Sequence, residues 1–410
     1  MNSITVKVVD SMMGTGKTSA AINLMNNMDE NKYIYITPYL DEVVRIKQSC
    51  VARKFFEPKV YTSEGEVYFK LDSLHKLLTE GKDIVTTHAL FKLATDETRE
   101  LIYNEGYTLV LDEALEVIQE LSVSPDDTKM LLKEWMKVAD NGLIQWDTAK
   151  EDKQGTYNGK FQLVRRYALN NNLVIHNGVI LLWNFPPNIF SLFKETYILT
   201  YLFKSQLQKY YFDIHGVSYE YWSVERIENK YQFTSQCHSS EKKIKEEIRN
   251  RINIYEGILN KIGEGNYSLS KSWYLNKKHL HRQLKNNTLN YFSNIMNSKS
   301  DKNMWTTYKD FKPKLSGKGY TKGYVSVNER STNKYQNKNV LVYTVNRFLS
   351  PILEGYFKSM NIKVDQEMFA LSELIQWIWR SAIRNNQRID IYIPSERMRR
   401  LLVSWLNDEL

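Results

Sequence analysis

Short apolar runs that stop at polar or glycine-rich residues recur through the first half of the chain. They lie at residues 4–9, 33–37, 84–86 and 108–111, with further runs at 179–183 and 197–199. Their β-branched and aromatic residues predict buried strands. Patterns typical of helices follow at 19–28, 41–50, 87–96 and 112–121. Because parallel strands need crossover connections, this alternation predicts an α/β fold with a mainly parallel sheet, which binds ligands at the carboxyl ends of its strands.

The second half continues the mixed pattern. Candidate strands lie at 303–307, 323–327, 340–345 and 389–393, and candidate helices lie at 370–384 and 397–406. Polar residues 147–159 predict a loop or a hairpin insertion. The composition shifts after residue 205, so we expect two α/β domains of similar size, at residues 1–205 and 206–410.

Composition narrows the class of protein. The 410 residues include 42% hydrophobic and 25% charged side chains, as in globular proteins. The sequence has no apolar run of about 18 residues, which a membrane helix would need, and its start does not read as a secretory signal. With two cysteines, Cys50 and Cys237, neither a disulfide framework nor a cysteine-built zinc site is expected. A reducing cytoplasm is the expected location.

Positive charge is concentrated in one stretch. The formal net charge is +9, and between Lys271 and Arg347 sixteen Lys or Arg residues face three acidic residues, Asp301, Asp310 and Glu329. Such a stretch fits a phosphate backbone, because neutralised phosphates release condensed counterions. A solvated lysine-rich surface explains the same charge equally well.

A glycine-rich turn at residues 11–19, SMMGTGKTS, lies between a predicted strand and a predicted helix. Backbone N–H groups of such a turn point inward and bind phosphates, aided by the positive end of the helix dipole. Gly14 and Gly16 supply backbone conformations that a Cβ would oppose. Lys17 brings a charge to the β/γ-phosphates, and the Thr18 hydroxyl can bind Mg²⁺. The phosphate-binding residues expected here are Met13, Gly14, Thr15, Gly16, Lys17, Thr18 and Ser19.

Two adjacent carboxylates, Asp112 and Glu113, end the apolar run at 108–111. In a phosphate site, Asp112 would hold Mg²⁺ opposite Thr18, and Glu113 would orient and activate the attacking water. Adjacent acids are also common at helix N-termini, where they favour the positive end of the dipole. The phosphate-binding turn upstream favours the catalytic interpretation.

Residues 11–18 and residues 112–115 (Asp-Glu-Ala-Leu) resemble two short sequence motifs, or boxes, of superfamily 2 helicases of the DEAD/DEAH type. Among these helicases the sequence is most similar to phage replication helicases and viral origin-binding helicases. The sequence differs from these boxes at two positions. Ser11 stands where the phosphate-binding box usually begins with Gly, and Leu115 stands at the last position of the acidic box. The resemblance implies two RecA-like P-loop domains with an interdomain ATP cleft, ATP and Mg²⁺ as cofactors, and ATP hydrolysis that drives a DNA helicase or translocase.

Further short segments of the chain resemble other boxes of these helicases, in the same order along the sequence. The resemblance implies that they contact nucleic acid. They are carried by Thr37, Pro38, Thr86, Thr87, His88, Thr306, Thr307, Thr332 and Asn333, and by Thr200 in the box that couples hydrolysis to DNA contact. The hydroxyl residues also suit strand ends, and His88 also suits a hydrogen-bonded structural role. Trp273 and Trp305 would either stack on bases or belong to the core.

Residues 376–384 resemble the last box of this helicase family. Gln376, Arg380 and Arg384 are spaced by four residues and would share one face of a helix. In the family such residues reach the γ-phosphate. The spacing of Arg380 from Gln376 matches the family and that of Arg384 does not, so Arg380 is the better candidate for an arginine finger. A solvated polar stripe would show the same spacing.

The expected partner is a single nucleic-acid strand in the channel, DNA rather than RNA, contacted through its backbone and not its sequence. Replication proteins are further candidate partners, membranes are not, and the resemblance implies a phage or bacterial source, with the host cytoplasm as the location. Three alternatives stay open. The chain could be a nucleotide-switched origin-recognition or loading ATPase that does not unwind, an RNA helicase, or a P-loop enzyme unrelated to nucleic acid.

Overall fold

A computed structural model describes residues 5–410 except 28–29, 64–65, 141, 237–239 and 329–332. The chain forms two compact units. The first comprises residues 1–11, 16–236 and 350–364, and the second comprises 12–15, 237–349 and 365–410. Each unit is built on its own mainly parallel sheet, so the predicted α/β fold class is confirmed. No helix within the described ranges combines the length and the apolar character needed to cross a membrane.

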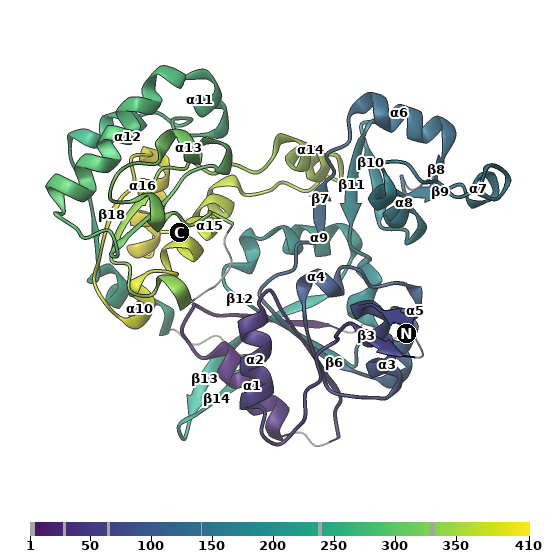
Figure 1. The fold of residues 1–410 in the computed structure, drawn as a ribbon. Helices are drawn as coiled ribbons and strands as arrows, with labels where there is room; N and C mark the ends of the chain where they lie inside the picture. Colours follow the sequence, from purple (N-terminus) through teal and green to yellow (C-terminus); the bar gives the residue numbers. More distant parts are fainter. Residues whose placement is uncertain (1–4, 28–29, 64–65, 141, 237–239, 329–332) are drawn as a thin grey trace. The chain divides into compact units, whose positions relative to one another are not determined.

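The sheet of the first unit has seven strands in the order β14-β13-β1-β12-β6-β2-β5 (Figure 1). Neighbours run parallel except β14, which is antiparallel to β13. The strands are β1 (Val6–Asp10), β2 (Tyr33–Thr37), β5 (Ile84–Thr87), β6 (Thr108–Asp112), β12 (Glu195–Thr200), β13 (Tyr219–Ile227) and β14 (Lys230–Thr234). The sequence patterns located the five strands β1, β2, β5, β6 and β12 to within two residues at each end.

Helices cover both faces of this sheet because consecutive strand residues point to opposite sides. Val9 and Tyr35 face one core, with α1 (Lys17–Asn27) and α2 (Leu40–Ser49). Val8 and Ile34 face the other, with α3 (Lys70–Thr79), α5 (Asp96–Glu105) and α9 (Leu207–His215). The short α4 (His88–Phe91) follows β5, and β3 (Tyr61–Ser63) pairs with β4 (Glu66–Tyr68) as a hairpin. The central strands are therefore continuously apolar.

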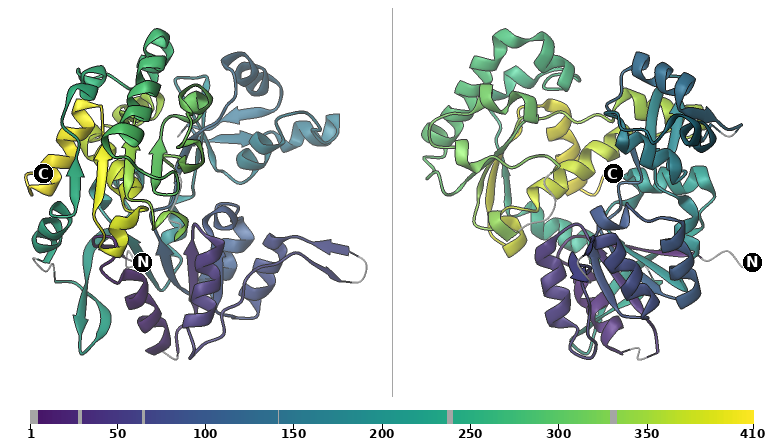
Figure 2. Two further views of the ribbon diagram at one scale, coloured as in Figure 1. Left: turned by 60° about the vertical axis from the view of Figure 1, so that its left-hand side comes forward. Right: turned by 45° about the vertical axis from the view of Figure 1, so that its right-hand side comes forward.

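A smaller subdomain interrupts the first unit between β6 and β12 (Figure 2). Its antiparallel sheet has the order β10-β11-β7, and its apolar side chains form a separate cluster around Leu131, Trp146 and Leu181. The elements are β7 (Ile118–Glu120), α6 (Pro125–Glu134), β8 (Met136–Val138), β9 (Ile144–Trp146), α7 (Thr148–Gln154), α8 (Gln162–Leu169), β10 (Leu173–His176) and β11 (Ile180–Asn184).

Two sequence predictions are wrong in this region. The helix expected at 112–121 is absent, because Glu113 takes a left-handed conformation (φ 63°) that ends the preceding strand, and β7 follows. The loop expected at 147–159 contains α7. Asp147 caps α7 by accepting a hydrogen bond from the Lys150 N–H (3.2 Å), and the buried Glu151 accepts one from the Trp146 indole (2.8 Å). The polar residues here are thus structural.

The second unit has a four-stranded, fully parallel sheet in the order β15-β18-β17-β16. Its core gathers Trp305, Val342 and Tyr392 with aromatic residues from the surrounding helices. The elements are α10 (Ser240–Arg249), β15 (Ile252–Ile254), α11 (Lys271–Asn276), α12 (His281–Asn290), β16 (Asn303–Thr306), α13 (Lys312–Leu315), β17 (Val340–Tyr343), α15 (Gln366–Ile378), β18 (Ile389–Tyr392) and α16 (Glu396–Leu406).

Two predictions for this half need correction. Residues 323–327 form no strand: Gly323 ends a 3₁₀ helix (Thr321–Gly323), and after it Tyr324 makes a single bridge to Trp305. The helix expected at 370–384 ends at Ile378. Ser381 ends it, because its hydroxyl donates to the Ile378 carbonyl (2.7 Å) and its N–H bonds to the same oxygen (3.0 Å).

The chain passes between the units more than once. Strands β13 and β14 lie beyond residue 205 and complete the sheet of the first unit. Helix α14 (Pro351–Ser359) also belongs to the first unit. Its Tyr356 ring meets His176 edge-on, with centroids 5.8 Å apart. The assignment of the two halves as RecA-like domains stays a prediction.

Candidate functional site

The turn that joins β1 to α1 has the backbone of a phosphate cradle. Gly14 and Gly16 adopt φ of 83° and 93°, which side chains with a Cβ rarely adopt. The Thr15 hydroxyl donates to the Met12 carbonyl (2.8 Å), and the Lys17 ammonium donates to the Ser11 carbonyl. The lysine thus folds back over the turn.

Strand β12 connects this turn with the two carboxylates. It lies between β1 and β6 in the sheet, with Asp10 beside Thr200 and Leu199 beside Asp112. The N–H of Ser11 donates to the Thr200 carbonyl (3.1 Å), and the N–H of Glu113 donates to the Leu199 carbonyl (2.9 Å). The carboxyl ends of three adjacent strands therefore hold the turn and the carboxylates at one edge, where open α/β sheets bind ligands.

The charges at this edge act on one another. Burial lowers the pKa of Lys17 to about 8, although Asp10, Asp112 and Glu113 oppose the shift. Burial and the charges of Glu113 and Glu42 raise the pKa of Asp112 to about 7, against the opposing effect of Lys17. Lys17 and Asp112 are therefore incompletely charged near neutral pH. A partly buried amine and a partly buried carboxyl in this state suit a triphosphate and a divalent cation, which would stabilise their charged forms.

Glu113 itself carries an unusual backbone. Its φ of 63° lies in the left-handed region, which few residues other than glycine and asparagine adopt. Such strain persists only where the surroundings impose it, and it is common at functional sites. Here the N–H bond to β12 holds the residue. The conformation turns the chain out of β6 directly after Asp112.

The residues of the first unit that the sequence predicts to contact nucleic acid include two that bond to Asp112. Thr37 is buried, and its hydroxyl donates to the Asp112 carboxylate (3.3 Å). His88 is buried, and its Nε2 donates to the Asp112 carbonyl (2.9 Å). Thr86 is also buried, whereas Pro38 and Thr87 are partly exposed. In this structure Thr37 therefore contacts the carboxylate of Asp112 and His88 its backbone carbonyl, and the partly exposed neighbours are more accessible to a ligand.

Three residues near this edge of the sheet were not predicted from the sequence. Asp10 accepts the N–H of Phe203 (3.0 Å) and acts electrostatically on Lys17. The Gln206 amide donates to the Thr200 hydroxyl (2.8 Å). Tyr231 of β14 lies against Gly16, where an added Cβ would collide with its ring. An acid just before the turn was a readable signal, but the other two contacts depend on long-range folding.

In the second unit, most of the described residues that were predicted to contact nucleic acid are buried. Trp305 belongs to the core, and Thr306 and Thr307 are buried at the end of β16. Trp273 is partly buried against the same core. Thr344, which the sequence did not indicate, bonds to the Thr306 carbonyl through its hydroxyl (2.7 Å) at the end of β17. The predicted residues 330–332, including Thr332, lie outside the described residues, as does the side chain of Asn333.

The residues of the last box do not share one helical face. Gln376 lies on α15, Arg380 follows its end, and Arg384 lies on a separate 3₁₀ helix (Ala382–Asn385). The Arg380 side chain is buried and donates to the Val327 carbonyl (3.2 Å), whereas Arg384 is partly exposed. Arg380 is thus bonded inside the second unit in this structure, and Arg384 is the more exposed of the two arginines.

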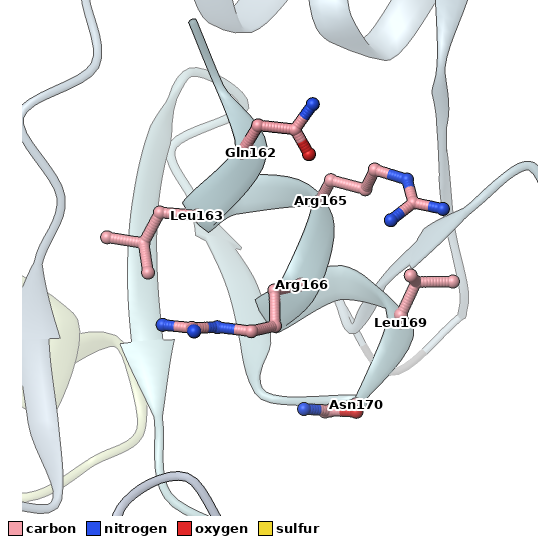
Figure 3. Close-up of a pocket in the computed structure, with 6 residues that line it drawn as sticks. All are labelled: Gln162, Leu163, Arg165, Arg166, Leu169 and Asn170. Atoms are coloured by element: carbon pink, nitrogen blue, oxygen red, sulfur yellow. The ribbon is translucent and has the colours of Figure 1, made fainter. Parts of the chain in front are cut away.

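Outside this edge, an open pocket of about 430 Å³ lies along α8 in the small subdomain (Figure 3). Arg165 and Arg166 line it, and Arg165 also pairs with the buried Glu151 (2.9 Å). No predicted site residue lines this pocket. Among the described residues, no group of three His, Cys, Asp or Glu side chains is arranged to hold a metal ion.

The fold and this edge define an α/β protein with a Gly-Lys-Thr turn between its first strand and first helix. The chain is 52% identical over 407 residues to the SPbeta prophage-derived uncharacterized protein YonV of Bacillus subtilis (strain 168), covering 98% of this chain and 99% of that protein. Residues 118–183 match the YonV middle domain, and residues 246–406 match the YonV C-terminal Rossmann-like domain. The chain belongs to the YonV family.

Two solved structures are similar to the whole chain at a distance. One, titled XPD_Helicase, has a TM-score of 0.49 and 13% identity, covering 99% of this chain and 95% of that one. The other, of S. tokodaii Xpd4, has a TM-score of 0.49 and 12% identity, covering 98% and 94%.

Proposed function

We propose that this chain is an ATP-driven motor on nucleic acid, a DNA helicase or translocase of the superfamily 2 type. One observation carries the proposal. The Gly-Lys-Thr turn and the two carboxylates meet at the carboxyl edge of one parallel sheet, where their charges act on each other. The order of the shorter boxes along the chain supports the helicase class over other P-loop enzymes.

The roles follow from the chemistry of the edge. The cradle from Met13 to Ser19 would bind the phosphates through backbone N–H groups, with Lys17 on the β/γ-phosphates. Thr18 and Asp112 would hold Mg²⁺, which neutralises phosphate charge when bound. Glu113 would orient the attacking water and accept its proton.

A charged side chain from the second unit would complete the site. Gln376 and an arginine would act on the γ-phosphate, where negative charge spreads in the transition state. We favour Arg384 for this role, because Arg380 is buried against the carbonyls of residues 326 and 327. The interdomain cleft that this role requires is part of the proposal.

Nucleic acid is the proposed substrate of the motor. The basic stretch between Lys271 and Arg347 offers charge for a phosphate backbone. The prophage origin named for the relative supports a phage or bacterial source, and we propose a role in DNA replication in the bacterial cytoplasm. Single-stranded DNA is the first candidate, and RNA is the second.

ATP turnover with and without nucleic acid tests the proposal. Wild type is assayed alone and with single- or double-stranded DNA or RNA, and Lys17→Ala serves as the blank. We expect turnover that a single strand stimulates, that falls steeply with salt, and that Lys17→Ala lacks. Turnover that no polymer stimulates would contradict the motor. Stimulation without displacement of an annealed strand would instead support the loading ATPase.

A further inference from the structure

One aromatic ring stands in solvent on the second unit. Tyr267 is 72% exposed, more than any other aromatic side chain that the structure describes. Its ring is stacked on Phe348, with centroids 5.6 Å apart and planes inclined by 28°. An isolated exposed tyrosine is ordinary, but one held in a stack with its outer side open requires an explanation.

The loop that carries Tyr267 is fixed on both sides of it. The fully buried Asn346 donates its amide to the carbonyls of Asn266 (2.8 Å) and Ser268 (2.9 Å). The backbone N–H of Asn346 donates to the Leu269 carbonyl (2.9 Å). One buried side chain therefore holds the residues before and after the exposed ring. The ring's position is set by the fold and not by chance packing.

A buried cation supports the stack. The Arg397 guanidinium lies 4.3 Å from the centre of the Phe348 ring. Arg397 also donates to Asn346 (2.9 Å) and to the carbonyls of Arg347 and Gln366 (2.8 Å each). The loop, the two rings and the guanidinium are thus connected by these contacts, and we term Tyr267, Phe348 and Arg397 the Tyr267 platform. A preorganised flat surface loses little conformational entropy when a ligand stacks on it.

The Tyr267 platform lies where a ligand is expected. Asn346 follows the end of β17, and its carbonyl accepts the Tyr308 hydroxyl (2.7 Å). The carboxyl ends of parallel strands are the usual binding edge of such sheets. Helix α11 begins close by in the chain, at Lys271, and opens the basic stretch that could contact phosphates.

We propose that the Tyr267 platform stacks against one base of a single nucleic-acid strand. The inference rests on the proposed function and adds a contact to bases, which backbone-binding residues do not make. Stacking suits any base, because every base has a π face, so binding there would tolerate all sequences. Phosphates next to the stacked base would lie toward the basic stretch.

The test compares Tyr267→Ala with Tyr267→Phe in binding to short oligothymidylate, oligouridylate and an abasic strand with the same backbone. Removing one stacked ring should weaken binding to both base-carrying strands roughly 5- to 150-fold. Tyr267→Phe should bind like wild type, because the hydroxyl is not needed for stacking. Wild type and Tyr267→Ala should bind the abasic strand equally.

Tyr103, which is 61% exposed on α5 in the first unit, provides a matched control. Tyr103→Ala should bind all strands like wild type. If wild type binds no strand, the motor and the Tyr267 platform both fail. If wild type binds but Tyr267→Ala binds equally well, or loses affinity for the abasic strand to the same extent, only the Tyr267 platform fails. The uridylate arm tells RNA from DNA.

Discussion

Asp112→Asn should stabilise the fold while it abolishes ATP turnover. In the folded chain burial and the charges of Glu113 and Glu42 raise the pKa of Asp112 to about 7, from its usual 3.8. An ionised Asp112 therefore disfavours the folded state, and a neutral amide of the same shape removes this penalty. The same substitution removes the carboxylate proposed for Mg²⁺. Stability and function should thus change in opposite directions.

The magnitude follows from the pKa shift. At 1.36 kcal/mol for each pKa unit, the difference sets an upper limit of about 4 kcal/mol. Asp112 is partly exposed, and its removal also deprives Lys17 of an attractive charge. We therefore expect a gain of roughly 1–3 kcal/mol in the free energy of unfolding. The gain should be absent below about pH 4, grow between pH 4 and pH 7, and remain constant above the folded pKa.

Thermal unfolding with EDTA present measures this gain. At pH 8 the midpoint of Asp112→Asn should exceed that of wild type by about 2–10 °C, and the difference should shrink as the pH falls toward 4. Asp127→Asn is the matched control. Its carboxylate accepts the Ser124 hydroxyl (2.8 Å), which lowers its pKa, so this change should not stabilise. A lower or unchanged midpoint for Asp112→Asn at pH 8 would refute the reasoning.

Three further predictions concern this edge of the sheet and the last box. Because burial lowers the pKa of Lys17 to about 8, ATP affinity measured by calorimetry should fall roughly tenfold per pH unit above that value; a flat profile from pH 8 to 10 would contradict it. Gly16→Ala meets both a positive φ and an aromatic ring, so it should lower stability by roughly 1–3 kcal/mol and impair ATP binding. Gly106→Ala, at a φ of 65° with open space, should leave ATP binding intact. Arg380→Ala should destabilise the chain by roughly 1–3 kcal/mol in urea titrations, whereas Arg384→Ala should slow turnover without destabilising; the reverse would exchange their roles.

The parts of the fold that could be predicted from sequence are local. The turn around Gly16 was predicted because strand, glycines and helix are consecutive, and Asp112 because an apolar strand leads into it. Parallel pairing of the central strands followed from their apolar runs and the helices between them. The order of strands across the sheet could not be read this way, since it depends on which distant segments pack together.

The errors occurred where long-range contacts override local pattern. Residues 112–121 have helix-forming composition, but the left-handed Glu113 and pairing with β11 make part of them a strand. Residues 376–384 have helical spacing, but Ser381 ends the helix early. The contact of the Thr37 hydroxyl with Asp112, a residue far away in sequence, could not be predicted from local pattern either, and the role of Thr37 in binding a ligand stays a prediction.

Cleavage of the chain by ATP-bound iron tests the central claim most directly. When Fe²⁺ replaces Mg²⁺ and hydrogen peroxide and ascorbate are added, the ion reduces peroxide to hydroxide and a hydroxyl radical, which cuts the backbone close to the ion, and ascorbate regenerates Fe²⁺. If Thr18 and Asp112 hold one metal–triphosphate complex, ATP-dependent cuts should appear around both residues and should disappear in Lys17→Ala. Cuts at only one of the two segments, or elsewhere in the chain, would contradict the account.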